Sequence, residues 1–187
     1  MLGAIAAAHG ARWEETLTGF KWIANRGLTL EKEGLRFVFG YEEALGYTVG
    51  TVVRDKDGVG AALVMADLAA WCRARGTTLE DELDVCARKY GLFVSRQVAV
   101  TMKGQDGAQK IAGIMGAVRA DPPTMLGAHA VTAFVDLERG ERRAGTEVTK
   151  LAFPPSNAIA LELAGGHRVM LRPSGTEPKI KYYFDVR

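Results

Sequence analysis

The sequence has no long apolar run and very little cysteine. No segment reaches the roughly 18 uncharged apolar residues of a membrane-spanning helix, and the small-residue opening carries no basic leader of a signal peptide. The two cysteines, Cys72 and Cys86, lie in apolar helical patterns without CxxC spacing or a histidine cluster. We therefore expect two reduced thiols in the core of a cytoplasmic protein that does not contact membranes.

Net charge is also small. At +2 for 187 residues it gives no reason to expect nucleic acid or an anionic membrane as a partner. The charge is unevenly distributed, because residues 1–91 carry 11 basic and 13 acidic side chains whereas residues 92–187 carry 13 and 9. The second half would therefore suit a small anionic ligand.

The first half reads as a mixture of helices and one strand. We expect a short helix ending at Gly10, an irregular stretch over 15–27, and a strand over 35–39. The segment after Asp57 is apolar most of the way round, which predicts a largely buried helix. Thr77, three residues before Glu80, predicts a capping box for the next helix, which Gly91 ends.

The second half reads as a small α+β domain. Strands are expected over 93–103 and 130–138, a helix over 107–121 that Pro122 stops, and three short strands after 157. The domain boundary is placed near Gly91, giving domains 1–91 and 92–187. His9, His129 and His167 are isolated in the sequence and are expected to be structural.

The motif RPSGTEP at 172–178 joins two strand-like runs and holds the residue types of a phosphate cradle. Arg172 supplies a forked guanidinium, Ser174 and Thr176 supply hydroxyls, and Gly175 would let backbone N–H groups turn inward as an anion-binding nest. An ordinary hairpin turn with an exposed arginine is an equal alternative for this motif alone.

Three further clusters could line a sugar site. Glu42 and Glu43 in GYEEALGY could accept hydrogen bonds from hydroxyls, although solvated loop charges are the favoured reading of that cluster alone. Asp57 is expected to cap the following helix, which leaves Lys56 for a phosphate or for water. In LTGFKWI, at 17–23, a turn beside aromatic side chains suits a sugar ring or core packing.

In this order, LTGFKWI, GYEEALGY, VRDKDG and RPSGTEPKIKYYF resemble the carboxyl-terminal half of an α-D-phosphohexomutase, the phosphoglucomutase and phosphomannomutase family. The resemblance spans nearly the whole chain and is closest to the phosphoglucomutase and phosphopentomutase-like branch. It implies an α/β fold, with a truncated third α/β domain over 1–91 and a small α+β, TATA-binding-protein-like fourth domain over 92–187. Both ends are then expected to be cut from a longer protein.

The resemblance also implies a role for each motif. Thr18, Gly19 and Glu42 would line the sugar pocket and Lys56 would approach the substrate phosphate. The phosphate that is not being transferred would be held by four residues of the last motif: Arg172, Ser174, Gly175 and Thr176. The sugar loop departs from the family at Ala44, where a serine is usual, which leaves the preferred sugar open.

The family's phosphoserine loop and magnesium loop have no counterpart in these residues. The implied parent enzyme interconverts hexose 1-phosphate and hexose 6-phosphate through a hexose 1,6-bisphosphate and uses Mg²⁺, whereas this chain alone would be inactive. Its partners would be a phosphosugar, the missing domains of the same protein, and a second copy in a homodimer. Phosphopentomutase and phosphomannomutase are the alternatives within the class, and a non-catalytic sugar-phosphate-binding module is the alternative outside it.

Overall fold

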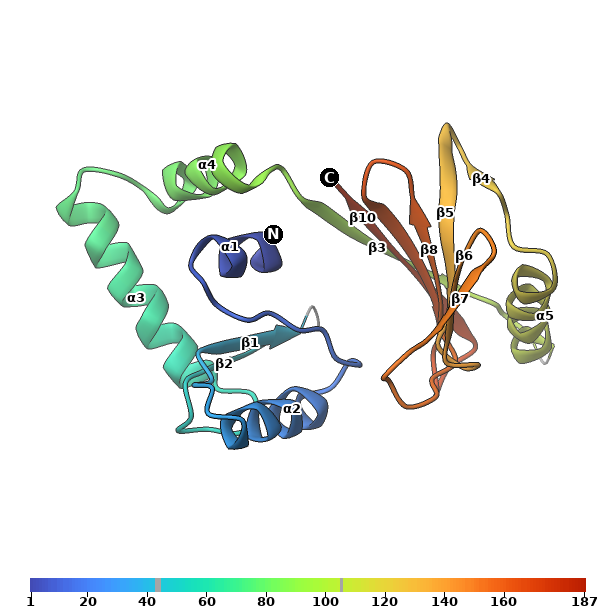
Figure 1. The fold of residues 1–187 in the computed structure, drawn as a ribbon, viewed down its shortest axis with the longest axis horizontal. Helices are drawn as coiled ribbons and strands as arrows, with labels where there is room; N and C mark the ends of the chain where they lie inside the picture. Colours follow the sequence, from blue (N-terminus) through green and yellow to red (C-terminus); the bar gives the residue numbers. More distant parts are fainter. Residues whose placement is uncertain (43–44, 105) are drawn as a thin grey trace. The chain divides into compact units, whose positions relative to one another are not determined.

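The computed structural model describes residues 1–42, 45–104 and 106–187. The chain divides into two compact units, unit 1 from Met1 to Gly91 and unit 2 from Leu92 to Arg187, and each is described by itself (Figure 1). None of the helices in these described ranges is both long enough and apolar enough to cross a membrane.

In its described residues, unit 1 combines four helices with one pair of strands. Its elements are α1 (Leu2–Ala8), α2 (Phe20–Lys32), β1 (Phe39–Glu42), β2 (Gly46–Val49), α3 (Gly58–Ala74) and α4 (Leu79–Tyr90). The two strands pair antiparallel, with Tyr41 opposite Tyr47 and Glu42 opposite Gly46. Because side chains alternate along a strand, Glu42, Gly46 and Thr48 lie on the buried face, while Tyr41 and Tyr47 lie on the exposed one.

Two expectations for unit 1 were wrong at the level of secondary structure. The stretch expected to be irregular contains the start of α2, which begins at Phe20 and continues through Gly27. Gly27 is buried because the helix passes close to Phe37, whose ring would lie 2.9 Å from an added Cβ. The strand expected over 35–39 instead runs from Phe39 to Glu42, so the two ends of the motif GYEEALGY, 40–42 and 46–47, belong to the two paired strands.

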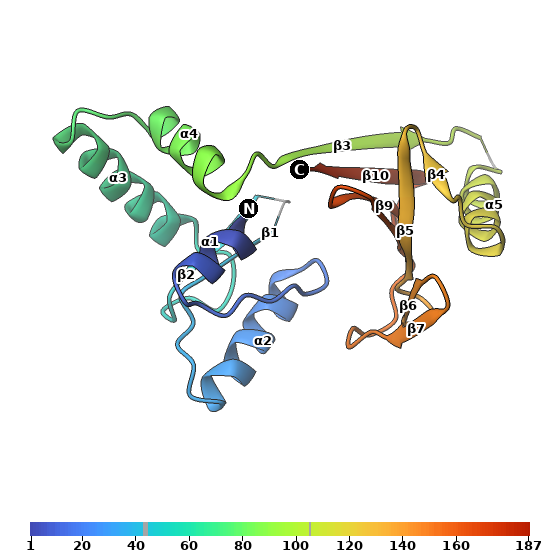
Figure 2. The ribbon, with the colours of Figure 1, turned by 45° about the horizontal axis from the view of Figure 1, so that its top comes forward.

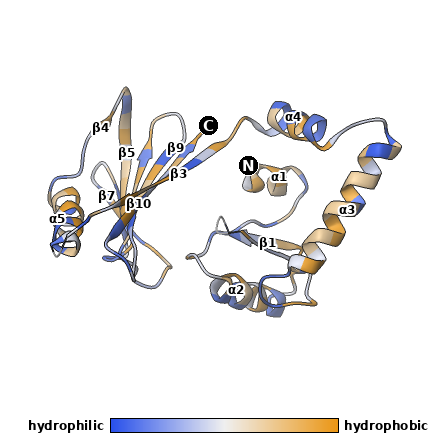
Figure 3. Ribbon diagram, turned by 180° about the vertical axis from the view of Figure 1, so that it is seen from behind, coloured by the Kyte–Doolittle hydropathy of each residue, from blue (hydrophilic) through white to orange (hydrophobic). Residues whose placement is uncertain are grey.

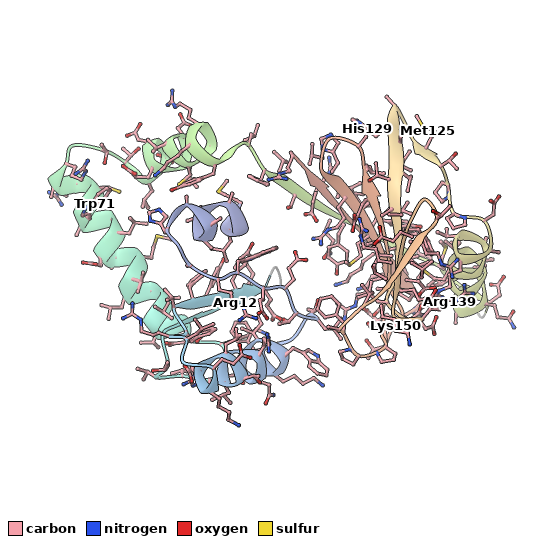
Figure 4. All side chains as sticks on the ribbon, viewed as in Figure 1. Arg12, Trp71, Met125, His129, Arg139 and Lys150 are labelled. Carbon is pink, nitrogen blue, oxygen red and sulfur yellow. The ribbon has the colours of Figure 1, made fainter. Side chains whose placement is uncertain are left out.

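The expectation that the helix after Asp57 is largely buried was also wrong. Figure 3 shows α3 as apolar along most of its length, yet only Cys72 among its residues is buried. Val59 is 84% exposed and Leu63 71%, and Trp71 near the carboxyl end of the helix is also exposed (Figure 4). An apolar pattern indicates which face of a helix could be buried. The described residues of unit 1 do not provide a surface that covers the apolar face of α3.

The capping box of α4 lies one residue later than expected. Thr78, not Thr77, is the N-cap: its hydroxyl accepts from the N–H of Asp81, and the Asp81 carboxylate accepts from the N–H of Thr78. Thr77 instead donates its hydroxyl to the carbonyl of Cys72, at 3.3 Å. Both cysteines are free, as expected, but only Cys72 is buried, whereas Cys86 is half-buried.

Unit 2 is an antiparallel sheet with one helix. Its elements are β3 (Val94–Thr101), α5 (Gly107–Ala120), β4 (Met125–Leu126), β5 (His129–Asp136), β6 (Glu141–Ala144), β7 (Glu147–Lys150), β8 (Ile159–Leu163), β9 (His167–Pro173) and β10 (Lys179–Val186). The strand order is β3-β10-β9-β8-β5-β6-β7, with β4 paired to β5. The strands and helix expected in this half are confirmed, whereas β4, β6 and β7 were not foreseen.

The core of unit 2 lies between α5 and one face of the sheet. Ile111 and Met115 of α5 pack against apolar side chains of β5, β8, β9 and β10, among which Ile159 and Ile180 are fully buried. Paired residues of an antiparallel sheet share a face, so Arg172 and Lys181, which are partners, lie on the other face. The core therefore fixes the strands that carry the last motif.

Candidate functional site

In unit 1 the site centres on Glu42, whose carboxylate is held between two elements. Glu42 is the last residue of β1 and points to the buried face, so its side chain is only 7% exposed. One carboxylate oxygen, Oε2, accepts a hydrogen bond of 3.0 Å from the backbone N–H of Gly19. The other, Oε1, lies 2.5 Å from Nζ of Lys56. A buried carboxylate needs such partners, and here they come from two different segments of the chain.

Gly19 can make this contact because it begins α2. It is the N-cap residue, with φ of 122°, a conformation that glycine adopts without strain. Since the N–H groups at a helix start have no partner within the helix, the Glu42 carboxylate satisfies one of them and also lies at the positive end of the helix dipole. Thr18, the preceding residue, is exposed, so its hydroxyl is open to a ligand.

Lys56 is held beside Glu42 by its neighbours along the chain. The N–H of Asp57 donates to the carbonyl of Tyr47 at 2.7 Å, and the Asp57 carboxylate caps α3 by accepting from the N–H of Gly60 at 2.8 Å. The expected cap is thus confirmed. The Lys56 side chain remains half exposed, and an ammonium has three donors, so it can pair with Glu42 and still bind a second anion.

Gly46 is a residue that sequence reasoning did not single out. It lies opposite Glu42 in the hairpin, and a Cβ added there would lie 2.7 Å from the Lys56 side chain and collide with the ring of Phe20. Its lack of a side chain therefore makes room for the contact between Glu42 and Lys56. The second glycine of GYEEALGY was the available signal. Glu43 and Ala44, between the two strands, lie outside the described residues.

In unit 2 the candidate site lies where β9 turns into β10. Arg172 of β9 stands directly opposite Lys181 of β10, so two cations occupy a cross-strand pair. Like charges in that arrangement repel, which favours a bound anion. Among the residues that the structure describes, neither cation makes an ion pair with a carboxylate, whereas the neighbouring Arg168 is 2.8 Å from Asp185.

Lys181 was missed as a candidate because it lies beyond the motif that was read as a turn. Its relation to Arg172 depends on strand register, and the sequence signal that could have revealed it is the alternation of Lys179, Ile180 and Lys181. That alternation puts both lysines on the face opposite the buried Ile180.

The connecting loop differs from the expected nest. Gly175 is absent from the residues with positive φ, so it does not supply the left-handed residue that a nest needs. The N–H of Ser174 is used in a hydrogen bond of 2.8 Å to the carbonyl of Lys179. The backbone N–H groups of Gly175 and Thr176 make no hydrogen bond within the described part of the chain, and both residues are exposed.

An internal ion pair closes the same loop. Nζ of Lys179 lies 2.6 Å from the carboxylate of Glu177, and this hydrogen bond holds the pKa of Glu177 below its usual range. Glu177 is therefore ionised at neutral pH and neutralises Lys179. Of the three cations beside the turn, Arg172 and Lys181 make no direct ion pair among the described residues, although the charge of Lys181 also helps to lower the pKa of Glu177.

The described residues do not offer a metal site. Over 1–42, 45–104 and 106–187, no three side chains of histidine, cysteine, aspartate or glutamate come together as ligands. The histidines have other contacts: Nε2 of His9 lies 3.1 Å from the Tyr90 hydroxyl, and the rings of His129 and His167 pack edge to face with centroids 4.6 Å apart. That the three histidines are structural stays a prediction.

Comparison with known proteins identifies the relatives of the chain. Residues 1–90 match the family model described as phosphoglucomutase/phosphomannomutase, alpha/beta/alpha domain III. A probable phosphomannomutase of Haemophilus influenzae is 37% identical over 187 residues, which are 100% of this chain and 34% of that protein. A phosphopentomutase of Mus musculus is 35% identical over 191 residues, 100% of this chain and 31% of that protein.

A solved structure shares the fold. The open form of the phosphoglucomutase pp63/parafusin from Paramecium superposes with a TM-score of 0.64 at 22% identity, and the match covers 98% of this chain and 31% of that one. The chain thus spans about a third of the length of the relatives it matches. It belongs to the α-D-phosphohexomutase family, and residues 1–90 correspond to domain III of that family.

Proposed function

We propose that this chain supplies the sugar-binding and distal-phosphate-binding parts of a phosphoglucomutase-type enzyme. That enzyme would interconvert hexose 1-phosphate and hexose 6-phosphate through a hexose 1,6-bisphosphate. The observation that carries the proposal is the buried Glu42 carboxylate, held at once by the Gly19 N–H and the Lys56 ammonium. A solvated loop charge would not be expected to have two such partners.

The fixed geometry of Glu42 supports the proposed sugar role. A carboxylate offers about four lone-pair directions, and Gly19 and Lys56 use only part of them. The remaining directions can accept hydrogen bonds from two hydroxyls of a sugar ring. Thr18 and Gly19 would line the same pocket, and Lys56 would pair with the substrate phosphate.

The phosphate role of the second site is supported by two cations, Arg172 and Lys181, that face each other without a direct ion pair among the described residues. Arg172 and Lys181 would grip the phosphate that is not being transferred, with the hydroxyls of Ser174 and Thr176 and the free N–H groups of Gly175 and Thr176 as further donors. A phosphate held by charge-assisted contacts can be either phosphate of the hexose 1,6-bisphosphate, since such contacts do not depend on the sugar. The chain would therefore position its substrate, which is most of what phosphoryl transfer asks of a protein.

The nucleophile and the metal belong to the rest of the proposed enzyme. The sequence has no phosphoserine-loop or magnesium-loop motif, and the described side chains offer no group of three metal ligands, so no step of the reaction is assigned to Mg²⁺ here. We accordingly propose that the chain is inactive alone, acts with further domains of the same protein, and works in the cytoplasm.

The names of the relatives support two alternatives within the class. Phosphomannomutase and phosphopentomutase both occur among them, and Ala44, which bears on sugar choice in the resemblance, lies outside the described residues. A non-catalytic sugar-phosphate-binding module is the alternative outside the class. A phosphoserine-loop motif in the coding sequence on the amino-terminal side of Met1 would favour the enzyme, and its absence from the gene would favour the module.

Binding to the chain itself tests the phosphate site. Calorimetry with glucose 1-phosphate, ribose 5-phosphate and inorganic phosphate should show weak binding that is almost indifferent to the sugar, because the transferable phosphate lacks its partners. Arg172→Ala should abolish it and Lys181→Ala should weaken it about tenfold or more, the size of a lost charge-assisted contact. Arg143→Ala in β6 is the matched control, since Arg143 pairs with Glu141 in another part of unit 2.

Two results would contradict the proposal. Unchanged binding by the Arg172→Ala variant would show that the turn between β9 and β10 is an ordinary hairpin. Turnover of glucose 1-phosphate by the purified chain in the presence of Mg²⁺ would show that the chain contains its own phosphoryl carrier.

A further inference from the structure

The strand β3 forms an open edge of the sheet of unit 2. It pairs with β10 along its whole length, and among the described residues it has no neighbour on its other side (Figure 2). All eight residues from Val94 to Thr101 are exposed. Such a strand presents a row of backbone N–H and C=O groups that can pair with another strand.

The two edges of this sheet differ in how they are protected. At the opposite edge, β7 has only four residues, and both of its ends, Glu147 and Lys150, are charged. Short length and charge are the usual means by which an edge is kept from pairing. In β3, by contrast, Arg96 is the one charged residue of eight, and no proline interrupts the strand.

The three valines of β3 lie on the core face. Val94, Val98 and Val100 are partners of Val186, Tyr182 and Ile180 in β10. Ile180 is fully buried under α5, so the valines continue the core face to the edge of the sheet, where each remains more than a third exposed. A strand added beside β3 would cover them.

We propose that β3 pairs antiparallel with β3 of a second copy of this chain, joining two unit 2 sheets across a two-fold axis. This interface does not depend on the proposed function. A two-fold axis perpendicular to the sheet keeps each face on its own side, so it pairs each residue with one of the same face. The axis passes midway between the two copies of one residue, which therefore pairs with itself. The middle of the strand is Gln97 and Val98, and either can be that residue on the axis.

The charges of β3 allow this self-pairing. About Val98, Arg96 stands opposite Val100 of the second copy, and about Gln97 it stands opposite Val98. In neither register do two like charges meet, so the cross-strand repulsion that would oppose pairing is absent. An acidic or basic peptide would gain little from an edge with one charge, whereas a second copy brings matching valines on the same face. A single strand pair buries less than a standard interface, so the dimer should be weak.

Cysteine cross-linking tests the pairing and its register. In a Cys86→Ser background, which leaves the buried Cys72, the variants Val98→Cys, Gln97→Cys, Val94→Cys and Val148→Cys are oxidised with a mild oxidant. At the residue on the axis the two new thiols face each other directly, within reach of a disulfide. At Val94 they would lie about eight residue positions apart in the register about Val98 and about six in the register about Gln97, or roughly 20–27 Å, and could not join.

The expected result is disulfide-linked dimer from Val98→Cys or Gln97→Cys at about ten times the yield of Val94→Cys or of Val148→Cys on β7. Light scattering on the unmodified chain should show a mass that rises toward the dimer with concentration. A monomeric mass up to about 1 mM would overturn the proposal, as would equal cross-linking at Val94 or at Val148. A dimer that cross-links at neither Gln97 nor Val98 would also overturn it, because the second copy would then use another surface.

Discussion

The two units place their candidate sites on very different supports. In unit 2, nine buried apolar residues form one cluster between α5 and the sheet. In unit 1, among the described residues, only Phe20 and Cys72 are buried apolar side chains, and α3 exposes most of its apolar surface. The Arg172 site therefore rests on a packed core, whereas the Glu42 site rests on a few specific polar contacts and close approaches.

The comparison teaches that a site can be well defined in a thinly packed unit. Glu42 accepts a hydrogen bond from the N-terminus of α2 and pairs with Lys56, and Gly46 has no side chain that would block this contact. None of these features needs a large core. Such a site should be sensitive to the loss of single polar groups. The position of the Arg172 site should depend on the core that sets the strand register, whereas its binding of phosphate should depend on the charges of Arg172 and Lys181.

The largest effect should come from the core of unit 2. Ile159→Ala removes a side chain that is 0% exposed and should destabilise unit 2 by about 2–5 kcal/mol, the usual cost of such a truncation in a packed core. Leu63→Ala on the exposed face of α3 should change stability by less than about 0.5 kcal/mol. Urea unfolding of each variant measures the difference. Equal losses for both variants would mean that α3 is packed in solution, and the contrast between the units would fail.

The next effect concerns the polar support of unit 1. Glu42→Gln keeps an acceptor for the Gly19 N–H but removes the charge that pairs with Lys56. In a longer protein that contains this chain and turns over a sugar phosphate, kcat/KM should fall at least about tenfold, as expected for a lost charge-assisted contact. Glu80→Gln on the exposed surface of α4 is the matched control and should leave kcat/KM unchanged. Equal kinetics for the two variants would return Glu42 to the role of an ordinary loop carboxylate.

The fold could be predicted where local pattern decides it. Alternation and turn residues gave β8, β9 and β10 correctly, because each strand has one face on the core. The pattern failed for α2, whose N-cap is a glycine without a capping side chain and whose interior holds Gly27, accommodated by the contact with Phe37. It also failed for the burial of α3, since burial depends on a covering surface that no local pattern contains.

The candidate site likewise has parts that the local sequence predicts and parts that depend on distant contacts. The motifs picked out Glu42, Lys56 and Arg172, because carboxylates and cations between glycines and strands are conspicuous in a sequence. They did not show that Glu42 is held by Gly19, twenty-three residues away, or that Lys181 faces Arg172. Both facts follow from how distant segments meet, and the conformation of Gly175 likewise depended on the turn adopted by the whole hairpin.

A smaller effect on stability is expected from the cap of α4, and it tests whether local contacts stabilise unit 1. Thr78→Ala removes the hydroxyl that caps α4 and should lower the stability of unit 1 by about 1 kcal/mol. Thr77→Ala, the neighbouring change, removes a hydroxyl with two long hydrogen bonds, 3.3 Å to the carbonyl of Cys72 and 3.5 Å to the carboxylate of Glu82, and should cost less. Urea unfolding followed by far-UV circular dichroism compares the two. A larger loss for Thr77→Ala would favour the cap at the position first expected from the sequence.

The smallest effect is a pH dependence of the same cap. The side-chain and backbone hydrogen bonds from Thr78 hold the pKa of Asp81 below its usual range. Because the folded state has the lower pKa, this contribution to stability is complete above the pKa of the unfolded chain and is lost as the pH falls through the folded value. The helical signal of α4 should therefore weaken in acid partly through Asp81.

In the Asp81→Asn variant that part of the acid sensitivity should vanish, while Glu80→Gln, whose carboxylate takes no part in the capping box, should keep it. An acid profile of circular dichroism that is identical for the unmodified chain and Asp81→Asn would show that the carboxylate contributes nothing to the cap, and that the Thr78 hydroxyl alone begins the helix.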